Sequence, residues 1–298
     1  MKKFWICLTL LISPPLFASE RFSRSQLMMG DVEVTITVSA ASVDEKNKVW
    51  TTMEQAFAAG SAIEKRVSEW NPESDTSQLN QSGGQPPRVV NDDLLLILLL
   101  ARDVSDWTGG AFDVTFASPD KTASYRDMVI DEATHQVSWQ KPGIKIGVSS
   151  TAKGYIVDQM IDVMKKAGFQ NVLINAGDIR AIGQDGKKPW TVLVRNEPKQ
   201  RDCTFSLKDQ ALSTSGTAAR GLHLIDPRIK QPVDTISSVS VLAPTSSLAS
   251  SLATGLFVLG KPSGLQLLKK SQRVSVLFID HQGGMAWTGK LQPRCTSR

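Results

Sequence analysis

The stretch TSSLASSLATGLFVLG, residues 245–260, decides the fold because it places a helix between two strands. Small hydroxyl residues crowd its beginning, and its apolar run then meets Gly260, a residue type that commonly ends helices. The flanking segments, SVSVLA from residue 238 and RVSVLFI from residue 273, are rich in β-branched residues, as strands are. This order predicts a chain that mixes helices with a sheet.

The first half of the chain shows the same mixture. VEVTITVS, residues 32–39, alternates apolar and polar side chains, which predicts a strand with one buried face. Ser42 and Glu45 have the spacing of a capping box and predict the start of a helix. The apolar side of that helix is expected to carry Val49, Trp50, Met53 and Phe57.

Two further helices and two further strands are expected before residue 200. Asp92 and Asp93 precede LLLILLLA, a run too short to cross a membrane and therefore typical of a core helix. KGYIVDQMIDVMKKAG predicts a helix that ends at Gly168. NVLI from residue 171 and WTVLVR from residue 190 predict strands. No Pro/Gly-rich linker divides these elements, so we expect a single mixed α/β domain of the α+β class.

The beginning of the chain has the pattern of a secretory signal. Lys2 and Lys3 precede the apolar run 5–12, and Leu-Phe-Ala at 16–18 predicts cleavage after Ala18. The alternative, a membrane anchor, is disfavoured because the run is shorter than the ~20 residues that a spanning helix needs. Segment 1–18 is therefore expected to be a signal peptide and segment 19–298 the mature domain. We expect a periplasmic protein and leave association with the inner membrane open.

Charge and cysteines limit the function classes. The net charge of +5 falls to +3 without Lys2 and Lys3, and the remaining basic residues are scattered. This pattern indicates a solvated surface and no nucleic-acid partner. Cys203 and Cys295 remain after cleavage, and an oxidising compartment permits a disulfide between them. Two separate thiols are the alternative that the sequence leaves open.

Common catalytic motifs are absent from the sequence. The three histidines, His135, His223 and His281, have no HExxH spacing, which makes a histidine-rich zinc site improbable. No GxSxG, GxGxxG or GxxxxGK[ST] motif occurs. GVSSTAKG, residues 147–154, resembles a phosphate-binding loop only weakly, because its lysine precedes the glycine.

Short polar islands carry a more specific signal. AKGY from residue 152, GDIRA from 177, STSG from 213 and DPR from 226 occur in this order. Together they resemble the ApbE family, the periplasmic FAD:protein FMN transferases, over essentially the whole mature chain. The resemblance implies one α+β domain that uses Mg²⁺ to transfer FMN from FAD to a threonine of an exported acceptor flavoprotein. AMP is the expected second product.

The resemblance also implies site residues, and several of them have a structural alternative. His223 is expected to accept a proton, or else to brace its loop. Trp70 is alternatively a core residue, Asp113 a turn residue and Lys153 a solvated lysine. Asp178 and Arg180 are expected either to pair with each other or to structure the GDIRA turn. The residues expected to contact FAD are Met29, Trp70, Ala111, Phe112, Asp113, Lys153 and Ile225.

The implied metal site departs from the family pattern. The family helix start reads ADALATA, whereas this chain reads ASSLATG from residue 249, so Thr254 is kept and Ser250 replaces an aspartate. Ser150 is expected to offer its backbone carbonyl, and Gly147 replaces a cofactor-contacting aspartate. One lost charge about 4 Å from a cation is worth roughly 4 kcal/mol at an effective dielectric of 20, or about three powers of ten in affinity. Asp226 is a candidate substitute carboxylate.

Two functions follow from this departure. The first is an active transferase whose metal site uses Ser150, Ser250 and Thr254. The alternative is a non-catalytic FAD-binding protein of the same family. FAD pyrophosphatase activity, with water as the acceptor, is a third reading that the sequence does not separate from transfer.

Overall fold

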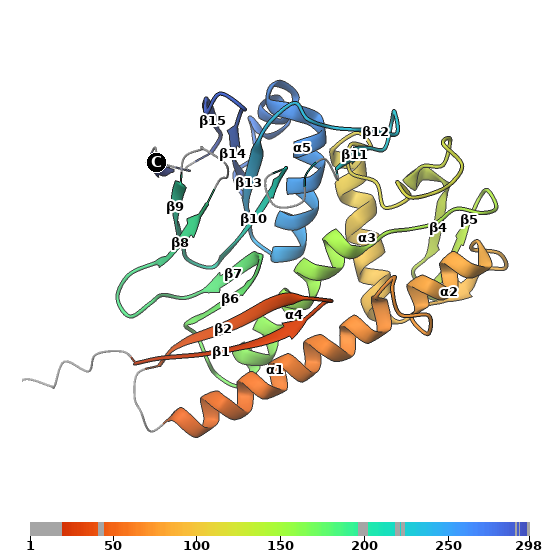
Figure 1. Cartoon of the computed structure of the whole chain (residues 1–298). Helices are drawn as coiled ribbons and strands as arrows, with labels where there is room; N and C mark the ends of the chain where they lie inside the picture. Colours follow the sequence, from red (N-terminus) through yellow and green to blue (C-terminus); the bar gives the residue numbers. More distant parts are fainter. Residues whose placement is uncertain are drawn as a thin grey trace, which may run out of the picture.

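An antiparallel sheet of eight strands runs through the centre of the molecule, in the order β1-β2-β6-β7-β10-β13-β14-β15 (Figure 1). The computed structural model describes residues 20–40, 45–195, 202–217, 221, 224–289, 291 and 293–296. The predicted signal peptide, Ser42 and His223 lie outside these residues. The eight strands are β1 (Glu20–Met28), β2 (Val32–Ala40), β6 (Val172–Ala176), β7 (Asp178–Ile182), β10 (Gln210–Gly216), β13 (Ser238–Ala243), β14 (Ser275–Ile279) and β15 (Met285–Trp287).

Helices cover one face of this sheet. Figure 1 shows α1, α4 and α5 side by side, with α3 beyond α5, and contacts join each neighbouring pair. A short 3-10 helix, Tyr125–Asp127, lies in the segment that follows α3. The helices are α1 (Lys46–Val67), α2 (Asp75–Ser82), α3 (Asp92–Trp107), α4 (Ser149–Lys166) and α5 (Ser246–Leu268).

Smaller sheets complete the fold. A three-stranded sheet, β16-β9-β8, packs on the face of the large sheet opposite the helices, and a second one, β3-β5-β4, lies beyond α2 and α3. The pair β11-β12 forms a hairpin. These strands are β3 (Arg88–Val89), β4 (Met128–Asp131), β5 (Gln136–Trp139), β8 (Trp190–Val194), β9 (Asp202–Leu207), β11 (Ile225–Asp226), β12 (Gln231–Pro232) and β16 (Arg294–Thr296).

The alternation of side chains along the strands builds two cores. In β14, Val276 and Phe278 belong to the large core beneath the helices. Leu277 and Ile279, on the other face of the same strand, pack in a smaller core with Phe205 of β9. Since successive side chains of a strand point to opposite faces, one sheet separates two apolar layers. The predicted single mixed α/β domain is therefore confirmed.

The helix predictions hold with one correction. α3 is a core helix whose N-cap is Asn91, and α4 ends at Lys166 with Gly168 at a φ of +95°. α1 begins at Lys46 with Glu45 in the N-cap position and without a side-chain cap. The predicted capping box is therefore wrong for Glu45, which stands at the N-cap and not three residues inside the helix.

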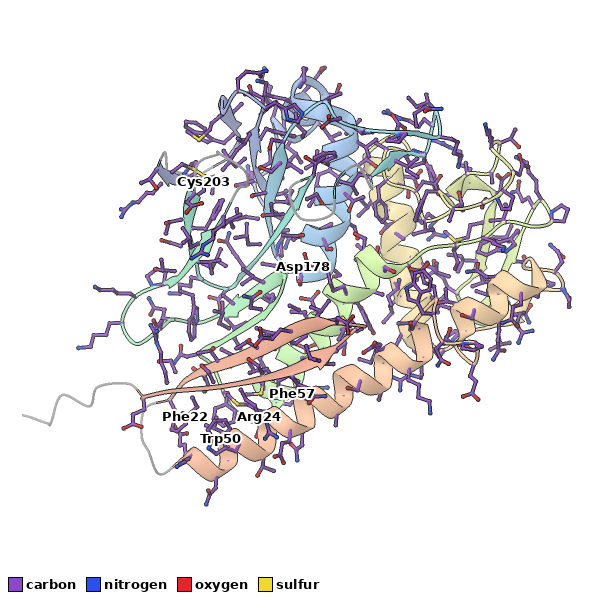
Figure 2. The ribbon with its side chains drawn as sticks, in the orientation of Figure 1. Phe22, Arg24, Trp50, Phe57, Asp178 and Cys203 are labelled. Carbon is purple, nitrogen blue, oxygen red and sulfur yellow. A yellow bond between two sulfur atoms is a disulfide. The ribbon has the colours of Figure 1, made fainter. Side chains whose placement is uncertain are left out.

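Strand β1 is fastened to helix α1 as well as to β2. Phe22 meets Trp50 edge to face, with 6.0 Å between the ring centroids, and Arg24 forms an ion pair with Glu54 (Figure 2). Trp50 and Phe57 lie on the side of α1 that the sequence predicts to be apolar. These contacts hold the edge strand of the large sheet against the helical layer.

Cys203 of β9 and Cys295 of β16 stand opposite each other in the strand register and form a disulfide. The alternative of two separate thiols is therefore excluded. Within the described ranges, no helix combines the length and the apolar character that crossing a membrane requires.

Candidate functional site

Helices α4 and α5 run antiparallel along a contact that we call the α4–α5 seam: Ser150, Thr151, Gly154 and Asp158 face Ser246, Ser247, Ser250, Ser251 and Thr254. A Cβ atom at Gly154 would lie only 2.4 Å from the backbone oxygen of Ser246. The small residues of the predicted helix start therefore serve first to let the two helices approach closely.

One end of the seam is a cluster of three hydroxyl groups, which we call the hydroxyl cluster. Ser150 Oγ lies 3.0 Å from Thr254 Oγ1 and 3.5 Å from Ser250 Oγ, and it donates to the Ser250 carbonyl at 3.3 Å. Ser150 and Thr254 are half-buried, so the cluster is reached from solvent. The structure thus brings together the three residues predicted as metal ligands, from positions about 100 residues apart.

At the other end of the seam, the charged side chains of Asp158 and Arg180 join the helices to each other and to β7. Asp158 accepts hydrogen bonds from the backbone N–H groups of Ser246 and Ser247, at 2.8 and 2.9 Å, and from the Ser247 hydroxyl. Arg180 Nε lies 3.5 Å from the same carboxylate. Burial raises the pKa of Asp158, while these hydrogen bonds and the arginine oppose the rise. Asp158 therefore caps α5 and anchors it to α4 and β7.

Lys153 is paired with a buried carboxylate. Its Nζ lies 3.1 Å from Asp178 Oδ2, and Asp178 Oδ1 accepts a hydrogen bond of 2.5 Å from Ser213. Figure 2 shows Asp178 in the middle of the molecule, where β7 meets α4. The side chain of Asp178 is 3% exposed and that of Lys153 is 31% exposed. The predicted pairing of Asp178 with Arg180 is wrong, since each finds its partner on α4.

Residues 111–113 lie against the opposite side of α5. A Cβ atom at Gly255 would be 3.0 Å from Phe112 Cβ, which places this segment next to Thr254. Asp113 accepts hydrogen bonds from the backbone and hydroxyl of Thr115 and from the backbone N–H of Tyr125. Burial raises the pKa of Asp113, against the lowering effect of these bonds. Asp113 thus holds the loop, as its structural alternative proposes, and its contact with FAD stays a prediction.

The β11-β12 hairpin carries the predicted Ile225, which is 37% exposed. Next to it, Asp226 accepts two hydrogen bonds from the Arg228 side chain, at 2.9 and 2.6 Å. Burial raises the pKa of Asp226, but the Arg228 hydrogen bonds and charge outweigh it and hold the pKa below its usual value. Arg228 already supplies a counter-charge to this carboxylate, and the role of Asp226 as a substitute for the lost metal ligand stays a prediction.

Two other predicted residues lie on turns. The backbone N–H of Met29 donates to Glu64 Oε2 at 2.9 Å, and Met29 has a φ of +52°. Trp70 is 86% exposed, which excludes the alternative of a core residue. Among the contacts of the described residues, none joins Met29 or Trp70 directly to the hydroxyl cluster.

Gly147 lies between Glu69 and the loop that carries Asp113. Its N–H donates to Val114 O at 2.8 Å, and the space beside its Cα is filled by Phe116 and by the Glu69 carboxylate. Sequence reasoning missed Glu69 because its proximity to Gly147 follows from the fold and from no local pattern. Asp178 and Lys153 are both singled out by the sequence, but nothing in the sequence predicts their pairing.

The hydroxyl cluster offers oxygen ligands, which suit Mg²⁺, but all of them are neutral. In the described part of the chain, no group of three or more His, Cys, Asp or Glu side chains is arranged to hold a metal ion. Mg²⁺ is commonly held by one or two protein oxygens together with substrate phosphates and waters. The cluster therefore fits a magnesium ion whose charge is balanced mainly by a substrate.

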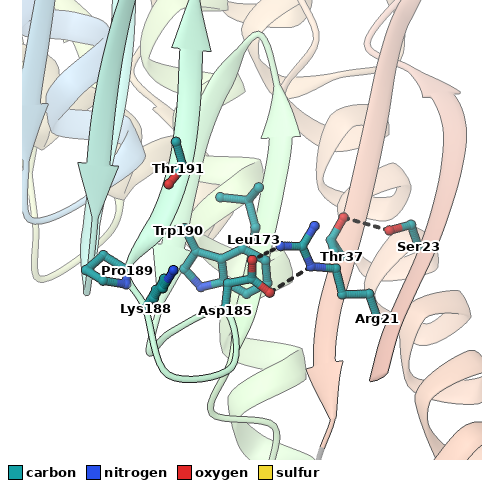
Figure 3. Close-up of a pocket in the computed structure, with 9 residues that line it drawn as sticks. All are labelled: Arg21, Ser23, Thr37, Leu173, Asp185, Lys188, Pro189, Trp190 and Thr191. Atoms are coloured by element: carbon teal, nitrogen blue, oxygen red, sulfur yellow. Dashed lines mark hydrogen bonds and ion pairs between the residues drawn. The ribbon is translucent and has the colours of Figure 1, made fainter. Parts of the chain in front are cut away.

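A surface cavity of about 410 Å³ lies away from these residues, between the β1-β2 pair and the turn before β8 (Figure 3). It is lined by residues that include Arg21, Asp185, Lys188 and Trp190, and by none of the predicted site residues. Arg21 Nε donates to Asp185 Oδ1 at 2.7 Å, so the two charges neutralise each other. This cavity is separate from the candidate site.

A model of the ApbE family matches residues 29–278. The chain belongs to the ApbE family. Among its relatives, an FAD:protein FMN transferase of Haemophilus influenzae is 27% identical over 275 residues, which is 78% of this chain and 80% of the relative. A second, from Treponema pallidum, is 25% identical and covers 87% and 84% of the two chains.

Solved structures of the ApbE family share the fold. The flavin transferase ApbE of Vibrio cholerae superposes with a TM-score of 0.76 at 23% identity, over 91% of this chain and 97% of that one. The apo form of the Pseudomonas stutzeri flavinyl transferase ApbE gives 0.77 at 23% identity, over 92% and 95%. These likenesses confirm the predicted architecture over nearly the whole described chain.

Proposed function

We propose that this protein transfers FMN from FAD to a threonine hydroxyl of an exported acceptor flavoprotein and releases AMP. The observation that carries the proposal is the hydroxyl cluster at the open end of the α4–α5 seam, in a chain that belongs to the ApbE family. Relatives along most of its length are named FAD:protein FMN transferases.

In the proposed reaction the threonine oxygen attacks the phosphorus on the FMN side of the pyrophosphate. A bond forms between this oxygen and phosphorus, and the bond to the AMP phosphate breaks, so that AMP leaves with the bridging oxygen. The hydroxyl proton passes to His223, because an imidazole is well suited to accept a proton near neutral pH. His223 lies outside the described residues, so its role rests on the sequence resemblance alone.

The described residues supply positioning. The half-exposed ammonium of Lys153 is held in place by the buried Asp178 carboxylate. This cation can form an ion pair with a phosphate oxygen of the substrate. Met29, Trp70, Ala111, Phe112, Asp113 and Ile225 are proposed to contact FAD. Ser150, Ser250 and Thr254 would hold Mg²⁺, which when bound neutralises charge on the pyrophosphate.

A specific observation supports a second candidate, the non-catalytic FAD-binding protein. The three hydroxyls already bond one another, and no carboxylate contacts them among the described residues. Metal-independent FAD binding is the signature of this alternative. Fluorescence titration of FAD with and without Mg²⁺ distinguishes it from the transferase, in which Mg²⁺ tightens binding.

The decisive experiment is intact mass spectrometry of a purified flavin-acceptor domain after incubation with the mature protein, FAD and Mg²⁺. A gain of one FMN on the acceptor threonine is expected, and an acceptor Thr→Ala variant provides the control. No gain beside a working family transferase would overturn the proposal, whereas free FMN and AMP without acceptor labelling would indicate pyrophosphatase activity.

Export to the periplasm, with removal of residues 1–18, is proposed from the charged and apolar pattern of the N-terminus. The Cys203–Cys295 disulfide supports it, because such bonds persist in oxidising compartments. Mass spectrometry of the protein from a periplasmic fraction is expected to show Ser19 as the first residue. A chain that keeps its first 18 residues would contradict the predicted cleavage.

A further inference from the structure

The space beside Gly147 is occupied by a carboxylate from another part of the chain. A Cβ atom at Gly147 would lie 3.0 Å from Glu69 Oε2 and 2.8 Å from Phe116 Cε1. Contacts this short are tighter than ordinary van der Waals packing, so a side chain at residue 147 would have to displace both groups. The missing side chain at Gly147 therefore leaves the space that the Glu69 carboxylate occupies.

Glu69 is held in this position from two sides. The Ser149 hydroxyl donates to Glu69 Oε1, which ties the side chain to the beginning of α4. The Glu69 backbone carbonyl accepts a hydrogen bond of 3.0 Å from Ser77 of α2. The loop is fastened further by Ser74, whose hydroxyl donates to the Ser68 carbonyl at 2.6 Å. The carboxylate is therefore placed before any ligand arrives.

The second oxygen of this carboxylate is available. Within the described ranges Glu69 forms no ion pair, and its Oε2 accepts no hydrogen bond. The side chain is only partly exposed. A partly desolvated carboxylate oxygen without a donor favours a ligand that brings O–H or N–H groups.

The surroundings of Glu69 narrow the ligand class. Trp70 follows it in the chain and is 86% exposed, while Phe116 is 40% exposed and its ring meets the same space beside Gly147 as the Glu69 carboxylate. An exposed tryptophan next to Glu69 in the chain, together with an aromatic ring close to the Glu69 carboxylate, suits a ligand that joins a flat ring to hydroxyl groups. FAD has this composition, since a ribityl chain with three hydroxyls links its flavin ring to the phosphates.

We propose that Glu69 is a substrate-binding residue whose free Oε2 accepts a hydrogen bond from a ribityl hydroxyl of FAD. The inference rests on the proposed function, because it takes FAD as the substrate. The proposal adds a substrate contact from the segment between α1 and α2. The Glu69 carboxylate, which lies beside Gly147, would help to position FAD.

The test compares FAD affinity, by flavin fluorescence, for the mature wild-type protein, Glu69→Ala and Glu73→Ala. Glu73 lies on the same loop and is exposed, so its variant is the matched control. Loss of a hydrogen bond to a charged group is expected to weaken FAD binding about tenfold to a hundredfold in Glu69→Ala, with no change in Glu73→Ala. ADP, which lacks the ribityl chain, is expected to bind both variants equally.

A rescue separates this contact from general damage to the loop. Gly147→Asp alone is expected to weaken FAD binding, because its side chain meets Glu69 and Phe116. In Glu69→Ala/Gly147→Asp the vacated space accepts the new carboxylate, and FAD affinity is expected to recover to within about threefold of wild type. Equal thermal unfolding temperatures for the single variants check that folding is intact.

Several results would overturn the proposal. Equal FAD affinity of Glu69→Ala and Glu73→Ala would do so, as would a double variant no better than Glu69→Ala. A loss seen only when Mg²⁺ is present would assign Glu69 to the cation and not to a hydroxyl. If wild type itself binds no FAD, the proposed function fails together with this inference, whereas wild-type binding with an unaffected Glu69→Ala removes the inference alone.

Discussion

The two ends of the α4–α5 seam are joined by different chemistry. At the closed end, Asp158 receives three hydrogen bonds from the start of α5 and faces Arg180. At the open end, the hydroxyl cluster of Ser150, Ser250 and Thr254 contains no charge and is partly exposed. At the closed end the charged groups are paired with each other and with the start of α5, although the buried Ser246 hydroxyl has no hydrogen-bond partner among the described residues, so this end is expected to stabilise the fold. At the open end, the neutral hydroxyl oxygens can give up their hydrogen bonds to one another and bind a ligand instead.

The largest test of this contrast is Asp158→Ala. The substitution leaves two N–H groups of α5 without their acceptor and a mostly buried Arg180 without its counter-charge. Breaking a buried pair in this way is expected to cost about 3–5 kcal/mol of unfolding free energy. Urea unfolding measures it, with the exposed Asp103→Ala as control. A loss below 1 kcal/mol would contradict the assignment of the closed end as structural.

The second test removes the close approach between the helices. In Gly154→Ala the new Cβ atom meets backbone atoms of Ser246 and Ser247 at 2.4–2.6 Å, so the helices must move apart. The expected cost is about 1–3 kcal/mol. Thermal unfolding of this variant beside Gln159→Ala, on the same helix, provides the measurement. Unchanged stability would show that the seam is looser than its geometry indicates.

The third test puts charge into the open end. Ser250 is 4% exposed, so Ser250→Asp buries a carboxylate and is expected to destabilise the protein by roughly 1–2 kcal/mol without metal. Mg²⁺ is expected to restore the unfolding temperature, because binding to the folded state stabilises it. Ser250→Asn, of the same size, is expected to show no such recovery. If both variants respond alike to Mg²⁺, the cluster does not hold a cation.

The smallest effect concerns the pair formed by the buried Asp226 and the half-exposed Arg228. Because Arg228 holds the folded pKa of Asp226 below the usual 3.8, the pair stabilises the protein at neutral pH and loses this contribution as the pH falls through the lowered value. Asp226→Asn is therefore expected to cost less than about 1 kcal/mol at pH 7 and to match wild type in strong acid. Acid titrations of unfolding for both proteins give the comparison, and a difference that grows toward low pH would reverse the sign argued here.

The sequence predicted the elements whose patterns are local. α3 and α4 and strands such as β2 and β13 each carry their periodicity within one segment, and the small polar residues of α5 were visible as unusual. The resemblance to a family then placed Ser150, Ser250 and Thr254 together, which the structure confirms as neighbours. Their binding of a metal remains a prediction.

The long-range charge pairs could not be predicted in the same way. Asp178 and Arg180 are two residues apart on β7, so they share a face of the strand, and the sequence alone favours a pair between them. That shared face lies on α4, where Lys153 and Asp158 offer opposite charges, and each strand residue pairs with the helix instead. Glu69 was missed for the same reason, because nothing near it in the sequence indicates Gly147.

The disulfide divides the chain into a ring and an open segment. Cys203 and Cys295 are 92 positions apart, and the loop they close contains β10, β13 and the whole of α5. Helix α4 lies outside this ring. When the protein unfolds, Ser150 separates from Ser250 and Thr254, but the disulfide keeps the loop that carries Ser250 and Thr254 closed. A closed loop of about 100 residues lowers the chain entropy of the unfolded state by an amount worth roughly 4.7 kcal/mol. On refolding, α4 packs against a helix whose segment is already restricted by the disulfide. The α4–α5 seam therefore joins a segment inside the disulfide loop to a segment outside it.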